Sequence, residues 1–296
     1  MGEARTRLPV IFISHGGGPC FWTQLPPPFT PTSFDGLAAY LRGLDARIGV
    51  RPRAVLVVSG HWETERPTVN VAAHPPLLFD YFGFPEHTYR LTYPAPGSPE
   101  VAARVRAVLA AAGIASDAEA ERGLDHGVFV PFKLIYPEAD VPIVEMSIRH
   151  DLDPAAHIAI GRALEPLREE GVLIVGSGFS YHNLRALFGG ADDRASEAFD
   201  AWLVDAVTDS DPEARARKLI RWQEAPAARL CHPREDHLIP LMVAAGAAGV
   251  DLGRHAYADR IAGKAVSGFE FGGRLKARGS APGPCWGLEA PDPRSL

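Results

Sequence analysis

Five histidines of this 296-residue chain lie in segments rich in glycine, serine or aspartate, beside runs of apolar residues. Imidazole is the commonest metal ligand in proteins and the usual acid or base near neutral pH. Four of the five lie just after, or close to, a run that is typical of a buried strand, and open α/β sheets place their sites at strand ends. The five are His15, His61, His126, His182 and His237. Their pattern predicts a convergent metal or acid–base site.

The residues around each histidine indicate how it could reach such a site. His15 is followed by three glycines, which let the backbone turn sharply and leave room for a ligand. His61 and His182 follow serine–glycine segments, SGH and SGFSYH. His237 opens an apolar stretch typical of a core-facing helix, where a buried imidazole needs a partner. Taken alone, His15 and His61 are equally compatible with a structural turn or cap.

Composition restricts the partners and the compartment. The chain has a formal charge of −6 and no dense basic run that would follow a phosphate backbone, so we expect no nucleic-acid partner. No apolar stretch reaches the ~18 residues of a membrane span, so we expect no membrane association. The three cysteines form no C-x-x-C pair, which disfavours a disulfide framework or thiolate zinc site and favours the reducing cytoplasm. The oligomeric state is left open.

Several well-known catalytic motifs are absent from the sequence. It has no H-E-x-x-H, no G-x-x-x-x-G-K-[ST] and no strand followed by G-x-G-x-x-G, so a zincin protease and a nucleotide site have no support. Gly176-Ser177-Gly178 falls short of the G-x-S-x-G nucleophile elbow. We expect His232, which precedes Pro233, to lie in a loop. The remaining histidines are expected at the surface: His74, His87, His150, His157 and His255.

The apolar runs predict the elements that position the histidines. Four runs are apolar almost throughout, which is typical of strands buried on both faces, and a fifth is a candidate edge strand. The four are Val10–Ser14, Ala54–Ser59, Val141–Ile148 and Val172–Gly176, and the fifth is Ala265–Phe271. Helices are expected over 34–48, 98–113, 153–171, 194–207, 212–222 and 234–248. This alternation predicts an α/β fold, with a central mostly parallel or mixed sheet, helices on both faces and a site at the carboxyl ends of the strands.

We expect a single domain over residues 8–271 and a Pro/Gly-rich tail over residues 272–296. Two proline-rich segments, 25–31 and 74–99, are expected to be structured loops that form a lid or a pocket wall. Four aromatic residues near them are candidates for that wall, although anchoring a loop in the core is the commoner role. They are Phe21, Trp22, Tyr81 and Phe82.

Taken together and in order, seven segments resemble one known family over roughly residues 8 to 271. They are SHGGGP (14–19), SGHWET (59–64), YPAPGSPE (93–100), GLDHGVFVP (123–131), YPEADVPIVEMSI (136–148), SGFSYHNL (177–184) and REDHLIPL (234–241). The sequence is similar to the extradiol ring-cleaving dioxygenases whose type member is the catalytic subunit of protocatechuate 4,5-dioxygenase. Within that family it most resembles the DOPA extradiol dioxygenase branch.

The resemblance implies an enzyme that uses O2 to open a catechol ring, giving a semialdehyde, at a mononuclear non-haem iron(II) site that is sometimes isolated with zinc. By the matching motifs, His15, His61 and His237 would be the metal ligands. His182 would be the catalytic acid–base residue, described as a fourth ligand in some members. His126 would line the substrate pocket.

One departure concerns the third ligand. The protocatechuate type uses two histidines and a carboxylate, the facial triad of oxygen-using iron sites. Here the matching position is His237, and a three-histidine site fits zinc as well as iron. Glu63, Glu235 and Asp236 are the alternative carboxylate ligands.

Two other functions remain open from the sequence. Three histidines with an open metal position would also serve a zinc hydrolase. A non-enzymatic binding module on the same fold is the other alternative, which the presence of all five histidines disfavours. The substrate itself is not specified, but a carboxylated catechol would need a cationic anchor, for which Lys133, Arg149 and Arg185 are candidates.

Overall fold

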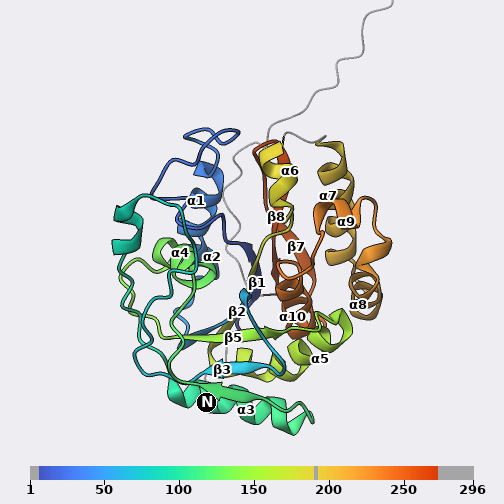
Figure 1. Cartoon of the computed structure of the whole chain (residues 1–296). Coiled ribbons are helices and arrows are strands. Elements are labelled where there is room, and N and C mark those ends of the chain that lie inside the picture. Colours follow the sequence, from blue (N-terminus) through green and yellow to red (C-terminus); the bar gives the residue numbers. More distant parts are fainter. Residues whose placement is uncertain (1–6, 190–192, 273–296) are drawn as a thin grey trace, which may run out of the picture.

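Four buried parallel strands form the centre of an eight-stranded sheet (Figure 1). They are β5 (Ile143–Arg149), β2 (Ala54–Thr64), β6 (Val172–Gly178) and β1 (Val10–Ser14), in that spatial order. The computed structural model describes residues 7–189 and 193–272. Because helices cover both faces of these strands, their residues are apolar almost throughout rather than alternating. The expected α/β fold with a mixed sheet is confirmed.

Antiparallel pairings extend the sheet on both sides. β8 (Lys264–Phe271) pairs with β1 and with β7 (Gly253–Ile261), so the edge is β7 and not, as expected, the segment that forms β8. On the other side β3 (Thr68–Asn70) pairs with β5, and β4 (Asp117–Glu119) is the outermost strand. The sequence did not predict β3, β4 or β7, which are short or largely polar and lack a continuous apolar run.

Helices form a layer on each face of the sheet (Figure 1). On one face α10 (Ile239–Ala248) packs against α5 (Pro154–Leu164) and contacts β1, β2 and β6. On the other face α4 (His126–Ile135) contacts β2, β6 and α1 (Asp35–Arg42). The other helices are α2 (Leu44–Ile48), α3 (Pro99–Ala111), α6 (Leu184–Gly189), α7 (Arg194–Val207), α8 (Pro212–Ile220) and α9 (Ala228–Cys231), with 3₁₀ turns at Glu86–Arg90, Glu165–Glu170 and Trp222–Glu224.

Three helices begin with the same local signal, a capping side chain followed by proline. The side chains of Ser98, Asp153 and Asp211 each accept a backbone N–H from the first turn of α3, α5 and α8. Proline at the first helical position loses no hydrogen bond, because that N–H has no partner within the helix. The predicted starts of these three helices are confirmed.

The apolar run after His126 is a helix, which the sequence had suggested to be strand-like. Pro131 lies inside α4 and lacks the N–H that would otherwise bond to the carbonyl of Gly127. The Ser177 hydroxyl on β6 donates to that carbonyl instead. A tertiary contact therefore satisfies the backbone group that proline leaves free.

Four other elements have boundaries that differ from the prediction. The helix expected over 34–48 is interrupted at Gly43, and the one expected over 153–171 ends at Leu164 and continues as a 3₁₀ turn. β2 continues past Ser59, so His61 lies within this strand at an irregularity in its pairing with β5. α10 begins only at Ile239, so His237 lies in the turn before the helix. Residues 273–296 of the expected tail, including Cys285, lie outside the described residues.

Candidate active site

All five predicted site histidines meet in one cluster at the carboxyl end of the central strands. His15 follows β1, and its N–H donates to Gly178 O over 2.9 Å. The ring centroid of His61 lies 4.9 Å from that of His15, 4.0 Å from that of His126 and 4.6 Å from that of His237. His182 stacks on His237 with the ring centroids 3.5 Å apart. The predicted convergence of these residues is confirmed.

Two glycines let the turn that carries His237 approach the sheet. A Cβ on Gly178 would lie 2.0 Å from the carbonyl oxygen of His237, and one on Gly60 would lie 2.9 Å from that of Asp236. The same His237 carbonyl accepts the N–H of Phe179 over 3.0 Å. The glycines of the SGH and SGF segments are therefore needed for backbone contact beside the site.

Asp236 orients the rings of two site histidines. Its Oδ2 lies 2.8 Å from Nδ1 of His237, and its Oδ1 lies 3.8 Å from Nδ1 of His182. Because a carboxylate only accepts, His237 carries its proton on Nδ1, and its Nε2 presents a lone pair. Burial alone would raise the pKa of Asp236, but its contacts with His182 and His237 outweigh burial and hold that pKa well below its ordinary value.

Asp80 has the same role for two more histidines of the cluster, His126 and His61. Its Oδ1 accepts from both the backbone N–H and Nδ1 of His126, over 2.9 and 2.8 Å, and its Oδ2 lies 3.6 Å from Nδ1 of His61. Burial raises the pKa of Asp80, but the bond from His126 and the nearby imidazoles lower it to about 2. The sequence did not identify this residue, because Asp80 lies in the proline-rich 74–99 loop with no motif around it.

A buried polar network supports the backbone beneath the cluster. Ser59 Oγ donates to Asp125 Oδ1 over 2.9 Å, and Arg122 donates to Asp125 Oδ2 over 3.2 Å and to the carbonyl of His61 over 3.3 Å. Asp125 in turn donates its N–H to the fully buried Glu145, whose pKa is raised by burial. The network joins β2 and β5 to the start of α4, and so fixes His61 relative to His126.

The cluster has the donor chemistry of a divalent metal site. Burial, reinforced by the neighbouring imidazoles, lowers the pKa of His15, His61 and His237, to about 4 for His61, so these rings are neutral at pH 7. Both ring nitrogens of His15 are buried without a hydrogen-bond partner. The Nε2 atoms of His61 and His237 face each other at 3.1 Å. A cation bound between these lone pairs would satisfy all of them.

The ligand atoms form two neighbouring groups that have no residue in common. Those of His15, His61 and His126 all lie within 4.8 Å of one another, and so do those of His182, Asp236 and His237. Of the three alternative carboxylates, only Asp236 belongs to such a group. Glu63 pairs with Arg234, and Glu235 pairs with Arg229.

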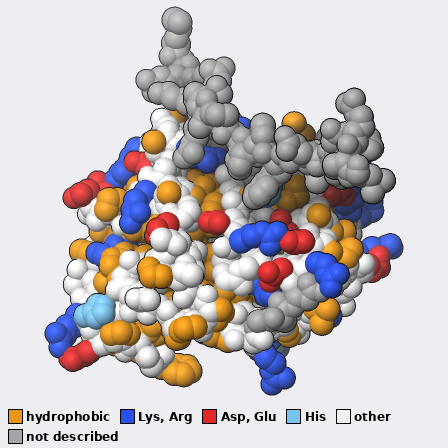
Figure 2. Space-filling view, turned by 90° about the horizontal axis from the view of Figure 1, so that it is seen from above, with side chains coloured by type: hydrophobic (Ala, Val, Ile, Leu, Met, Phe, Trp, Pro, Cys, Tyr) orange, Lys and Arg blue, Asp and Glu red, His pale blue; other side chains and the backbone are white. Residues whose placement is uncertain are grey.

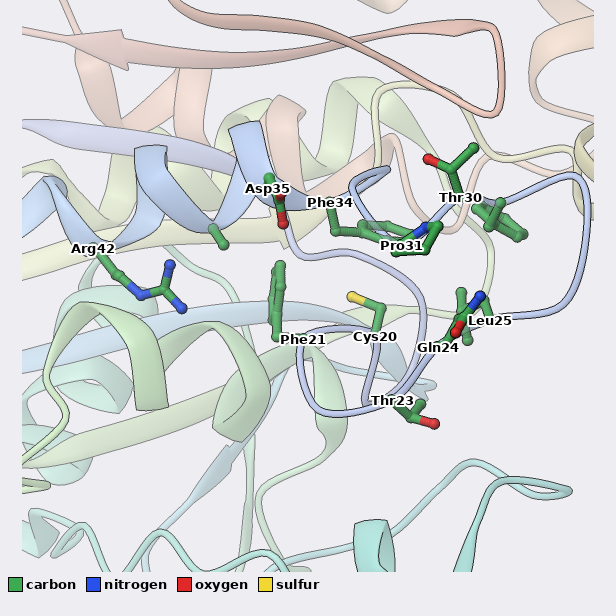
Figure 3. A pocket seen from close by; sticks show the side chains of 12 residues that line it. Cys20, Phe21, Thr23, Gln24, Leu25, Thr30, Pro31, Phe34, Asp35 and Arg42 are labelled. Carbon is green, nitrogen blue, oxygen red and sulfur yellow. The ribbon is translucent and has the colours of Figure 1, made fainter.

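A cavity of about 420 Å³ opens onto all five histidines. Both proline-rich loops line it, which confirms the expected pocket wall. Of the four candidate wall aromatics, only Phe82 lines this cavity. Phe21 lines a neighbouring cavity of about 270 Å³ (Figure 3). Trp22 and Tyr81 line neither; Tyr81 is buried, with its hydroxyl donating to Thr88 O.

Two histidines outside the site differ from their expected setting. His157 was expected at the surface, but it is fully buried on α5, where Nδ1 donates to Asp153 O over 2.7 Å and Nε2 accepts the N–H of Arg149 over 3.0 Å. His232 lies after α9, as expected for a loop, but it is also fully buried, with Nε2 2.9 Å from Ser180 O. Both hold loops in place and lie outside the residues that line the cavity.

Comparison with known proteins identifies the class to which this fold and site belong. The family described as the catalytic LigB subunit of aromatic ring-opening dioxygenase matches residues 9–269. Dioxygenase tasH of Hapsidospora irregularis is 39% identical over 91% of this chain and 88% of its own length. The 4,5-DOPA dioxygenase extradiol of Beta vulgaris is 43% identical over 67% of this chain and 74% of its own length. The crystal structure of an uncharacterized protein from Escherichia coli K12 matches with a TM-score of 0.71 at 26% identity, over 90% of this chain and all of that one.

The chain belongs to the LigB family of extradiol ring-cleaving dioxygenases. It is therefore an oxidoreductase that depends on a bound metal, in agreement with the donor chemistry of the histidine cluster. Within the described residues, no helix is both long and apolar enough to cross a bilayer. The face shown in Figure 2 carries acidic and basic side chains interspersed with apolar ones.

Proposed function

We propose that His15, His61 and His237 bind a single iron(II) and that the enzyme cleaves a catechol beside its two hydroxyl groups, giving a semialdehyde. The observation that carries the ligand assignment is the convergence of unprotonated nitrogens: His61 and His237 face each other through Nε2, and His15 has no other partner. Bound iron(II) would supply the Lewis acidity that lowers the pKa of the catechol hydroxyls and a path for electrons from the catecholate to O2.

His182 is suited to move the proton in this reaction. Its ring stacks on His237 and lines the cavity, and it is 22% exposed, so it can reach both the metal site and a bound catechol. Its Nδ1 faces Asp236, which favours one orientation of the ring, and this leaves Nε2 to accept the proton of a catechol hydroxyl and return it later. A fourth-ligand role is the alternative for His182, supported by a ligand atom that lies within 4.8 Å of one on His237.

His126 is suited to bind the substrate rather than to move its proton. Asp80 accepts from Nδ1 of this ring and from its backbone N–H, so the ring is held in one orientation. The same arrangement leaves Nε2 for a hydrogen bond to a substrate oxygen in the cavity.

The experiment that tests this function is O2 uptake after anaerobic iron(II) loading. The relatives named 4,5-DOPA dioxygenase make DOPA the first catechol to try, with protocatechuate and unsubstituted catechol beside it. We expect O2 uptake and a yellow product with at least one of them, and none with the zinc-loaded protein. No uptake with any catechol at one iron per chain would overturn the proposal. Ester or amide hydrolysis by the zinc-loaded protein would then favour a zinc hydrolase.

A further inference from the structure

Away from the histidines, the active-site cavity is almost entirely apolar. Gln24 is the one other polar side chain among the described residues that line it, and those residues include no Lys, Arg, Asp or Glu. A carboxylate or ammonium group bound here would lose its hydration without gaining a charged partner, which is strongly unfavourable. The described residues therefore provide no binding site for a charged substituent in this cavity.

The three cations that could have anchored a carboxylated catechol lie elsewhere. Lys133 donates to Thr92 O over 2.8 Å, and Arg149 pairs with Asp151. Arg185 is exposed on α6 and does not line the cavity. The neighbouring cavity contains Arg42, which extends into it from α1, but Asp35 from the same helix lines it too (Figure 3). Neither cavity therefore presents a net positive charge from its described side chains.

Large apolar side chains are exposed around the same cavity. Phe82 is 90% exposed, Leu184 56% and Phe188 52%, and all three line it. Five other large hydrophobic residues are comparably exposed among the described residues, and none of the five lines this cavity. Clustered exposed apolar side chains commonly mark a binding surface, because a ligand that covers them removes apolar area from water.

Three phenylalanines, Phe29, Phe34 and Phe188, form what we call the aromatic wall. The wall runs from the exposed Phe188 to the buried Phe29 and Phe34. Phe188 meets Phe29 edge to face at 5.4 Å between centroids, and Phe29 stacks on Phe34 at 5.6 Å. Phe29 and Phe34 also line the neighbouring cavity. A cavity of about 420 Å³ falls within the ~300–1,000 Å³ of pockets for drug-sized ligands, so a single catechol ring on the histidines would leave this wall uncovered.

We propose that the substrate is a catechol with an uncharged, apolar substituent, which lies along the aromatic wall and is covered by Leu184 and Phe82. This inference rests on the ring-cleavage function proposed above. It adds that an aliphatic or aromatic arm, and not an amino-acid or carboxylate arm, determines which catechol is accepted.

A chain-length series tests the substrate class. The iron-loaded full-length protein is assayed with catechol, 4-ethylcatechol, 4-butylcatechol, DOPA and protocatechuate. We expect kcat/KM to rise about threefold to fourfold per added methylene, the factor that ~0.8 kcal/mol per buried CH₂ corresponds to. DOPA and protocatechuate should fall below 4-ethylcatechol. A flat alkyl series, or a preference for either charged catechol, would overturn the proposal while leaving ring cleavage established.

A matched pair of variants tests the surface. Leu184 and Leu252 are almost equally exposed, at 56% and 57%, but only Leu184 lines the cavity. Leu184→Ala and Phe188→Ala should each raise KM for 4-butylcatechol about threefold to tenfold through lost apolar contact, a larger factor than for KM of catechol, which has no alkyl chain. Leu252→Ala should change neither. Equal effects of Leu184→Ala and Leu252→Ala would contradict the assignment of this surface.

Calorimetric titration of the metal-free protein with the same alkylcatechols separates this inference from the proposed reaction. Binding that tightens with chain length, with a negative heat-capacity change, would support the apolar site even if no catechol were cleaved. Binding that does not depend on chain length would refute the apolar site even if catechols were cleaved.

Discussion

The Nε2 atoms of His61 and His237 face each other at 3.1 Å, at the centre of the histidine cluster. Asp236 holds the His237 proton on Nδ1, and Asp80 lies on the Nδ1 side of His61 and favours the same tautomer. A cation bound between the two nitrogens would be coordinated by both lone pairs. We therefore propose that this pair of nitrogens marks the metal site.

Removing a ligand should remove the metal. We expect His15→Ala and His61→Ala to lose bound iron or zinc after dialysis, measured as metal per chain by mass spectrometry, because each removes one of three neutral nitrogens. His150→Ala, which changes an exposed histidine outside the cavity, should retain the metal content of the unmodified protein. Stoichiometric metal in both ligand variants would disprove the assignment.

The carboxylate behind His237 should tune metal affinity. Asp236→Asn keeps the shape of the side chain but removes the charge that orients His237, and such partners commonly contribute 10–100-fold in metal affinity. We expect a loss of that size in a chelator competition assay. Asp151→Asn, an exposed aspartate outside the cavity, is the control and should leave affinity unchanged. Equal affinities in the two variants would mean that Asp236 has no role in holding the metal ligand.

His182 should separate turnover from metal binding. We expect His182→Ala to lower kcat by roughly 10²–10⁴-fold, the usual contribution of general acid–base catalysis, with metal content largely intact. The readout is O2 uptake at a measured iron content. Unchanged turnover would remove the acid–base role, and loss of metal would instead indicate that His182 is a ligand.

Acid should destabilise the metal-free protein. Burial lowers the pKa of His15, His61, His157, His232 and His237, to about 4 for His61 and His232. Between the ordinary histidine value of 6.5 and these lowered values the unfolded chain binds more protons than the native one, so stability is fully present above pH 6.5 and is lost as pH falls. Burial raises the pKa of Glu145 and of Asp200, and these two groups oppose the trend set by the five histidines.

This pH dependence can be measured by urea unfolding in the presence of a chelator. We expect a lower midpoint at pH 5 than at pH 7, and the same difference between the two midpoints in His150→Ala, whose imidazole is exposed in the native state. A midpoint at pH 5 equal to or above that at pH 7 would show that the buried imidazoles are not held neutral by the fold.

Much of the fold could be predicted because its signals are local. Continuous apolar runs marked β1, β2, β5 and β6, and a capping residue followed by proline marked the starts of α3 and α5. The strands β3, β4 and β7, outside the parallel centre of the sheet, were missed because their pairing partners, and not their own composition, make them strands. α4 was misread because the hydroxyl that satisfies Gly127 comes from Ser177, 50 residues away in the sequence.

The site could be predicted only in part. The five histidines were identified from their motifs, but Asp80 became visible only when the 74–99 loop was placed against His126. In the same way, the exposure of His157 could not be read from its sequence, because burial depends on how α5 packs beside the end of β5. The position of Asp80 and the burial of His157 both depend on contacts between segments that are far apart in the sequence.

The most direct test of ring cleavage is to follow the fate of O2 in a single assay. The iron-loaded protein is mixed with a catechol that it accepts, O2 consumption is measured, and the product mass is determined. We expect one O2 to be consumed per catechol and a ring-opened product heavier than the substrate by two oxygen atoms. A product of unchanged oxygen content, or catechol turnover without O2 consumption, would contradict this expectation.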